Sequence, residues 1–252
     1  MPLRNVSYHP FRIPSLPTTA SPPFICLALK SADDTTVEGL IKNSVESSYR
    51  QQVDRLVSWS GNNNLDLNTS KAKEMIIDFR KETLSVVPLL IDGSSMEIVD
   101  TYKFLGTIIS SGLDWEENIN YILKKTQQRM YFLRQLKKFG LRREILVQFY
   151  IAVIESVLCF SLTVWYGSTT KDQRRRLNRV VRNAGRIVGC ELPPWEELHC
   201  KRTVARSRRI IADRSHPAND LFQLLPSGRR HRVLRARTNR LCSSFSTRPS
   251  VH

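Results

Sequence analysis

Two adjacent acidic residues, Asp33 and Asp34, are the clearest candidates in this sequence for a chemical role. They lie between the apolar stretch Phe24–Leu29 and the segment Thr35–Ile41, in a pattern that predicts strand, turn and strand. Two neighbouring carboxylates repel each other unless a cation offsets the repulsion, and magnesium is held by one or two such groups together with substrate phosphates. The pair is therefore a candidate magnesium site for nucleotidyl transfer, with a solvated turn as the alternative.

The spacing of apolar residues predicts the elements that position this pair. Residues 24–41 are expected to form a β-hairpin with both carboxylates at its tip. A helix capped by Asn43 or Ser44 should follow, and Gly61-Asn62-Asn63-Asn64 should end it. The 3–4 spacing of the apolar positions supports this helix. These positions are Val45, Tyr49, Val53, Leu56 and Trp59.

Strands are predicted next, and helices after residue 114. Met75–Phe79, Val86–Ile91 and Met96–Val99 are strand candidates, the last two flanking a turn at Asp92-Gly93-Ser94-Ser95. Tyr102–Ile109 is expected to be one extended run with Gly106 inside it. The first helix should span residues 114–140, with one face formed by Ile119, Ile122, Thr126, Met130 and Leu133.

Three further helices are predicted. One spans residues 142–166 and is expected to be a buried core helix rather than a membrane span, because polar residues interrupt it. Thr169 or Thr170 should cap the next, whose apolar stripe is Leu177, Val180, Ala184 and Ile187. A last helix is expected at about residues 195–212, after Pro193-Pro194.

Charge divides the chain into two unequal halves. Residues 1–120 hold 11 Lys/Arg and 15 Asp/Glu, whereas residues 121–252 hold 28 Lys/Arg and 8 Asp/Glu. A basic half of this size indicates a polyanionic partner, most simply RNA or DNA; a generically basic surface is the alternative. Arginine suits phosphate contacts. The candidate phosphate-binding residues are Arg175, Arg179, Arg182 and Arg186, which share one helix face, and Arg229, Arg230 and Arg232 near the C-terminus.

Five short segments carry a family resemblance. They are Ala32-Asp33-Asp34, Asn64-Leu65-Asp66-Leu67-Asn68, Ser70-Lys71-Ala72-Lys73-Glu74, Ile76-Ile77-Asp78-Phe79-Arg80 and Tyr102-Lys103-Phe104-Leu105-Gly106. In this order and at these intervals they resemble the C-terminal part of the reverse transcriptase of LINE-type (non-LTR) retrotransposons, over roughly residues 30–248. The resemblance implies an α+β fold, in which a partial polymerase palm precedes a basic, all-helical thumb-like region.

The resemblance also implies roles for individual residues. Asp33 and Asp34 would hold two Mg²⁺ ions, Lys71 would lie near the triphosphate, and Phe104-Leu105-Gly106 would form the primer grip. The family requires a third, upstream carboxylate, yet the 32 residues before Asp33 contain no Asp or Glu, and Ser31 replaces the usual aromatic residue. We therefore expect vestigial catalytic residues, no productive magnesium binding and no polymerase activity from this chain alone.

Four regions are predicted on this basis. Residues 1–23 are proline-rich and are expected to be a disordered leader. Residues 24–110 would form the partial palm, residues 114–190 the helical thumb-like region, and residues 191–252 a basic, partly disordered C-terminal region. The function predicted is that of a truncated RNA-directed DNA polymerase with residual nucleic-acid binding. The alternative is a nucleic-acid-binding protein without catalytic ancestry.

A further alternative involves residues 122–157, which also look like the N-terminal helical segment of AlkB-type tRNA-modifying dioxygenase/methyltransferases. That enzyme needs a His-x-Asp…His iron triad, and none of the five histidines is followed by x-Asp. Cys190, His199, Cys200 and His216 invite a zinc interpretation, but their spacing lacks the paired pattern of zinc sites. Neither a signal peptide nor a disulfide framework is evident, so we expect a cytoplasmic or nuclear protein without a membrane partner.

Overall fold

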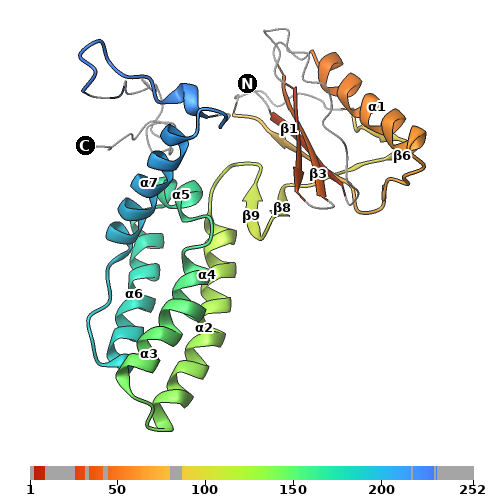
Figure 1. Ribbon diagram of the computed structural model, residues 1–252. Coiled ribbons are helices and arrows are strands. Elements are labelled where there is room, and N and C mark those ends of the chain that lie inside the picture. The colour runs from red at the N-terminus through yellow and green to blue at the C-terminus, as the bar shows by residue number, and fades with distance from the viewer. Residues whose placement is uncertain are drawn as a thin grey trace. The chain divides into compact units, whose positions relative to one another are not determined.

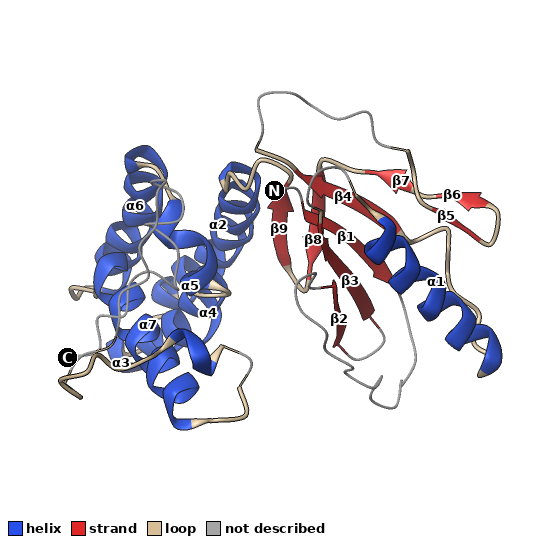
Figure 2. Cartoon of the chain, turned by 90° about the horizontal axis from the view of Figure 1, so that it is seen from above, coloured by secondary structure: helices blue, strands red, loops and turns tan. Residues whose placement is uncertain are grey.

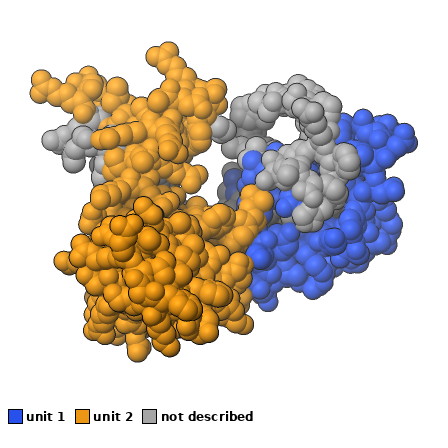
Figure 3. All heavy atoms as spheres, turned by 60° about the horizontal axis from the view of Figure 1, so that its bottom comes forward, with its two compact units in different colours: residues 1–104, 109–113 blue, residues 105–108, 114–252 orange. Residues whose placement is uncertain are grey.

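The computed structural model of the 252-residue chain describes residues 3–8, 26–31, 34–41, 45–79, 87–216, 218–229 and 231. The fold is α+β, as predicted. It divides into two compact units, which Figure 3 distinguishes by colour: residues 1–104 with 109–113, and residues 105–108 with 114–252. The first unit contains the strand-rich part of the chain and the second contains the long basic helices.

The described part of the first unit is built on a five-stranded sheet in the order β2, β3, β1, β4, β7 (Figure 1, Figure 2). β2 (Cys26–Ser31) and β3 (Asp34–Leu40) pair antiparallel, so the predicted hairpin is confirmed. β1 (Leu3–Tyr8) pairs antiparallel with both β3 and β4 (Lys73–Ile77). β7 (Glu97–Ile98) runs parallel to β4. β3 and β4 therefore point in the same direction on either side of β1.

Strand β1 differs from the prediction that residues 1–23 form a disordered leader. The segment Leu3–Tyr8 contains no proline and includes Val6 and Tyr8, which favour strands, whereas the prolines of this region are concentrated from Pro10 onward. Composition averaged over the whole region hid this short strand. Residues 9–23 lie outside the described residues.

Helix α1 (Ser47–Asn62) packs against β2 and β3 and closes a small apolar core. Tyr49, Val53 and Leu56 are buried as predicted, but Val45 precedes the helix and is exposed, and Ser60 is buried in the last turn. The predicted caps Asn43 and Ser44 lie outside the described residues. The core cluster consists of Val37, Tyr49, Val53, Leu56, Ala72, Leu89, Ile91 and Met96.

Two hairpins follow. β5 (Leu90–Ile91) and β6 (Ser94–Ser95) are joined by Asp92-Gly93, both with positive φ, as a type I′ turn requires. β8 (Thr101–Phe104) and β9 (Thr107–Ser110) form the second hairpin. The single extended run predicted for Tyr102–Ile109 is therefore wrong, because Leu105 (φ 44°) and Gly106 (φ 89°) reverse the chain.

The first helix of the second unit is α2 (Glu116–Lys138), whose predicted face is confirmed: Ile119, Ile122, Thr126, Met130 and Leu133 are all buried. The continuous helix predicted for residues 142–166 is wrong. It comprises α3 (Arg143–Phe149), the π-helix η1 (Tyr150–Glu155), α4 (Ser156–Leu158), α5 (Leu162–Trp165) and the 3₁₀ turn η2 (Tyr166–Ser168).

The helical break lies at residues 159–161, where Ser161 has a φ of 50°. The break lets the Trp165 Nε1–H donate to the Phe160 carbonyl at 2.9 Å while the indole is fully buried. Neither glycine nor proline marks residues 142–166 before Gly167, so the sequence gives no signal for the interruption.

Helix α6 (Lys171–Val188) is held at its start by a capping box between Thr170 and Gln173 and ends at Gly189 (φ 81°). Its buried positions are Gln173, Leu177, Val181, Ala184 and Val188, so the predicted stripe is right at Leu177 and Ala184 and wrong at Val180 and Ile187, which are half-buried. Helix α7 (Trp195–Ala212) follows Pro193-Pro194, as predicted, and a short 3₁₀ turn, η3 (Asn219–Leu221), comes after it.

No single helix within the described residues has the length and apolarity of a membrane span. One bent pair, Arg143–Leu158 with Leu162–Ser168, meets the criteria of length and composition across a 45° bend. Leu146, Tyr150, Ile154, Leu158 and Trp165 of this pair are buried within the unit.

Candidate nucleic-acid interface

The four predicted arginines of α6 form one exposed row. Arg175, Arg179, Arg182 and Arg186 are all exposed. At about 100° per residue they fall within an arc of about 60°, and at about 1.5 Å per residue the row is about 16 Å long. The buried positions of α6 lie on the opposite side of the helix, so packing aims the row away from the core.

Two neighbouring arginines of α6 bind within the protein instead. Arg176 Nη1 donates to Glu116 Oε1 at 2.5 Å, and a second nitrogen donates to Asn120 Oδ1. Arg174 donates to Thr169 Oγ1 at 3.0 Å and lies over the Tyr166 ring. In the helical projection these two arginines flank the row by about 100° on either side. The helix therefore separates arginines that stabilise the fold from arginines that face solvent.

Glu116 is the acceptor that connects α2 to α6. Gln173 Nε2 donates to Glu116 Oε2 at 2.9 Å, beside the bond from Arg176. The hydrogen bond from Gln173, followed by that from Arg176, lowers the pKa of Glu116 below its ordinary value. This arrangement was missed at the sequence level because Glu116 and Arg176 lie on different helices.

The members of the row have few partners in the described part of the chain. Arg175 forms one exposed pair with Asp172 at 3.6 Å. Arg179, Arg182 and Arg186 form no ion pair with a described carboxylate. An exposed pair such as Arg175–Asp172 contributes little to stability and is easily exchanged for another anion. The row is therefore available for external phosphates.

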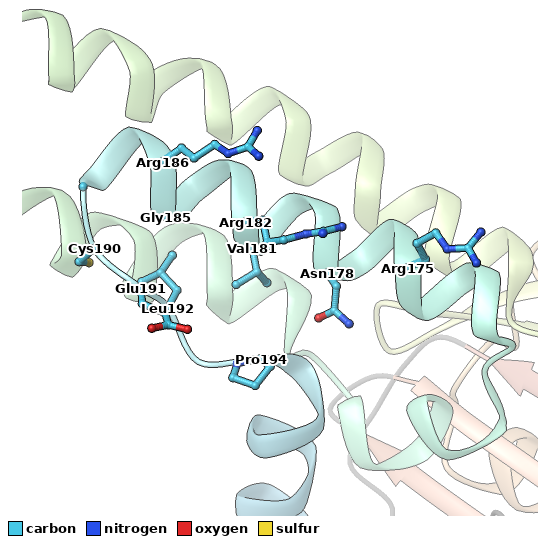
Figure 4. A pocket seen from close by; sticks show the side chains of 11 residues that line it. Arg175, Asn178, Val181, Arg182, Gly185, Arg186, Cys190, Glu191, Leu192 and Pro194 are labelled. Atoms are coloured by element: carbon cyan, nitrogen blue, oxygen red, sulfur yellow. The ribbon is translucent and has the colours of Figure 1, made fainter.

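A groove of about 830 Å³ lies beside the row (Figure 4). Arg175, Arg182 and Arg186 line it from α6, and the loop after Gly189 runs back along the helix as the other wall. Gly185 permits this close approach, because a Cβ there would lie 2.8 Å from the Cys190 carbonyl oxygen. Glu191 is the single carboxylate among the lining residues. The groove thus combines three cationic side chains with an apolar floor that includes Val181 and Leu192.

The predicted catalytic residues lie in the first unit. Asp34 begins β3, whereas Asp33 lies outside the described residues. Lys71 is exposed in a turn just before β4, where its N–H donates to the Asn68 carbonyl at 3.1 Å. Ser7 lies opposite both Thr36 and Lys73, so β3 and β4 begin at the same end of the sheet. Asp34 and Lys71 therefore lie at the same end of the sheet. Across the strands they are about two strand spacings, or 10 Å, apart.

The described residues include only one of the two predicted magnesium ligands, Asp34. Asp34 is the described member of the Asp33-Asp34 pair, and no group of three or more His, Cys, Asp or Glu side chains suited to a metal ion occurs among the described residues. Because Asp33 lies outside the described residues, the two-metal interpretation of the Asp33-Asp34 pair stays a prediction. Cys190, His199, Cys200 and His216 likewise form no such group among the described residues.

The remaining predicted contacts are scattered. Phe104, Leu105 and Gly106 occupy the β8–β9 turn, where a Cβ on Gly106 would lie 3.1 Å from Phe160. Arg229 is exposed in a turn after η3. Arg230 and Arg232 lie outside the described residues. Of the predicted phosphate contacts, only the α6 row is brought together within the described residues.

Cysteine reactivity offers a direct check of the second unit. Burial raises the pKa of the Cys159 thiol to about 12, and its residue is 3% exposed, whereas Cys200 is exposed on α7. At pH 8 in the native protein we expect Cys200 to react with a thiol reagent, while Cys159 reacts about 1,000-fold more slowly because little thiolate is present. Peptide mass spectrometry after timed labelling measures both rates; rapid native labelling of Cys159 would contradict this core assignment.

The structure thus defines an α+β protein with an exposed arginine row on a basic helical unit. A family model described as "Alkylated DNA repair protein alkB homolog 8, N-terminal" matches residues 115–156, about a sixth of the chain. The matched segment comprises α2, α3 and η1 and only the start of α4. No curated protein and no solved structure matches the chain. The resemblance to LINE-type reverse transcriptases has no counterpart among these comparisons.

Proposed function

We propose that this chain is a nucleic-acid-binding protein that contacts the phosphate backbone of RNA or DNA through Arg175, Arg179, Arg182 and Arg186. The observation that carries the proposal is that the arginines of α6 fall into two groups. Arg174 and Arg176 bind other residues of the protein, whereas the four arginines of the row face solvent. A row about 16 Å long can follow several consecutive phosphates.

The proposal includes descent from a LINE-type RNA-directed DNA polymerase. The five motif segments support it, as does the position of Asp34 and Lys71 at the same end of the sheet. Two of the three carboxylates implied by the resemblance, Asp33 and Asp34, are recognisable in these 252 residues. The activity proposed for these residues is nucleic-acid binding.

A second candidate rests on the family match at residues 115–156. On that basis the α2–α3–η1 segment would be an accessory helical segment of an AlkB-type dioxygenase/methyltransferase. The match covers helices and no oxygenase centre, and the His-x-Asp pattern is missing from the sequence. The match is compatible with nucleic-acid binding by the second unit, so the first proposal is preferred.

Salt dependence tests the proposed binding. Four phosphate contacts should give a slope of about −3 to −4 in a plot of log Kobs against log salt concentration, because each neutralised phosphate contributes about 0.7 for single strands and 0.9 for duplex. Between 50 and 200 mM salt we expect affinity for a 20-nucleotide probe to fall about 50- to 150-fold. Fluorescence anisotropy measures this; a flat response would exclude phosphate contacts as the source of binding.

A further inference from the structure

The α2–α3 tip, defined as the C-terminal half of α2, the Phe139-Gly140 turn and the start of α3, carries cations and exposed aromatic rings together. Phe139 is 79% exposed, Phe132 56% and Tyr131 55%. Residues 118–143 contain eight Lys/Arg and no Asp or Glu. These cations are Lys124, Lys125, Arg129, Arg134, Lys137, Lys138, Arg142 and Arg143. A contiguous patch of large exposed apolar residues often marks a binding surface.

An apolar groove of about 750 Å³ opens at this tip, between α2 and the α3–η1 segment. Phe132, Phe139 and Phe149 supply aromatic surface, and Arg129, Gln135 and Ser156 supply polar groups. This volume lies in the ordinary range of about 300–1,000 Å³ for ligand sites. The groove belongs to the second unit and is lined by none of the residues that line the groove beside α6.

The π-helix η1 shapes the inner wall of this groove. Arg129 Nη1 donates to the Val153 carbonyl at 2.5 Å, and Val153 lies in η1. A π-helical turn is uncommon and is found frequently at functional sites, because it widens the helix and redirects backbone groups. Here the Val153 carbonyl of the π-helix holds the guanidinium of Arg129 at the groove.

We propose that the groove at the α2–α3 tip binds unpaired bases of single-stranded nucleic acid. Aromatic side chains stack on bases of any identity, while surrounding cations contact the phosphates. Bases in a duplex are already stacked and paired, so duplex cannot use the aromatic surface. The inference rests on the proposed nucleic-acid binding and narrows its substrate class to single strands.

Charge decides between this occupant and others. A second copy of the chain would bring six further cations against the six of this tip, and like charges disfavour that contact. The six are Arg129, Arg134, Lys137, Lys138, Arg142 and Arg143. A strand of phosphates with intervening bases complements both the cations and the aromatic rings. An acidic peptide would satisfy the cations but would not provide the planar rings that Phe132 and Phe139 can stack on.

A tryptophan reporter tests stacking directly. The full chain carrying Phe139→Trp should fluoresce more strongly than wild type, because it has one more tryptophan. We expect added dT20 to quench this additional fluorescence, because a base stacks on the new indole. A 20-bp blunt duplex and inorganic polyphosphate should leave that additional fluorescence unchanged. Equal quenching by duplex or polyphosphate would overturn the inference, as would an acidic peptide that displaces dT20 and quenches equally.

Removing the two aromatic side chains tests their contribution to affinity. The double variant Phe132→Ala/Phe139→Ala should bind dT20 about 10-fold or more weakly at fixed salt, since each stacked base is worth a measurable part of the affinity. Affinity for duplex should not change. Phe160→Ala, which removes another exposed ring of the same unit outside the groove, should bind dT20 like wild type. Equal loss in all variants would overturn stacking at the tip.

The two proposals fail in different ways. If no oligonucleotide binds at any salt concentration, the proposed function fails and the inference fails with it. If dT20 and duplex bind with equal affinity and the phenylalanine variants change neither, phosphate binding stands and stacking at the tip is wrong. Concentration-dependent dimerisation that the double variant abolishes would identify a second copy as the occupant and would overturn the inference.

Discussion

Replacing Arg175, Arg179, Arg182 and Arg186 together by glutamine is expected to weaken nucleic-acid binding about 100- to 1,000-fold at 50 mM salt. Each lost phosphate contact removes about 1 kcal/mol, and the four act on one backbone. The slope of log Kobs against log salt concentration should become shallower by about 3. All four side chains are exposed, so the fold should keep its stability. Anisotropy titrations at three salt concentrations measure both effects.

Arg176→Gln is the matched control, because it removes one arginine from the same helix without touching the row. Its ion pair with Glu116 and its bond to Asn120 would be lost. Both partners are partly exposed, so the cost in stability should be about 1 kcal/mol or less. Binding and its salt slope should match wild type. If Arg176→Gln weakened binding as much as the quadruple variant, the loss would follow the fold and not the row.

The arginine row could be predicted because a single helix fixes it. Arg175, Arg179, Arg182 and Arg186 recur at intervals of three and four residues, and Thr170 and Gly189 mark the ends of the helix. What could not be predicted was which arginines of α6 face solvent and which bind other residues of the protein. Arg176 is adjacent to the row in sequence, yet it turns about 100° away and meets Glu116, 60 residues earlier. Such long-range partners are invisible to local spacing.

The apolar stripe of α6 shows how neighbouring faces are confused. Val180 and Ile187 are as apolar as Val181 and Val188, and both pairs keep a spacing of seven residues. The second pair lies about 100° further round the helix, and it is the pair that is buried. Packing against α2, α3 and α7 chose between them. Apolarity alone permitted both choices.

The sheet was predictable where local turns define it. The β2–β3 hairpin and the Asp92-Gly93 turn each join strands that are neighbours in the sequence. The central position of β1 was not predictable, because Leu3–Tyr8 pairs with strands about 30 and 70 residues later and residues 9–23 carry no strand pattern. The groove at the α2–α3 tip had a sequence signal, namely the acid-free run of residues 118–143 with exposed aromatic residues, but only the π-helical wall gives that run a shape.

Trp165→Ala is expected to lower the free energy of unfolding by about 3–5 kcal/mol, a large share of the about 5–15 kcal/mol typical of a folded domain. The indole is fully buried, its Nε1–H donates to the Phe160 carbonyl at 2.9 Å, and its ring meets Tyr166 edge-on at 6.0 Å. Removing it leaves a cavity and an unsatisfied carbonyl at the helical break. Urea unfolding followed by circular dichroism at 222 nm measures the loss.

Two companion variants separate the causes of that loss. Trp165→Phe keeps most of the ring volume but loses the hydrogen bond, so it should cost about 1–3 kcal/mol. Phe160→Ala removes a half-exposed ring next to the break while its backbone carbonyl still accepts from Trp165, so it should cost about 1 kcal/mol or less. A Trp165→Ala variant as stable as wild type would mean that the break at residues 159–161 is not held by the indole. The interrupted helix, with the π-helix that walls the groove, would then need another source of stability.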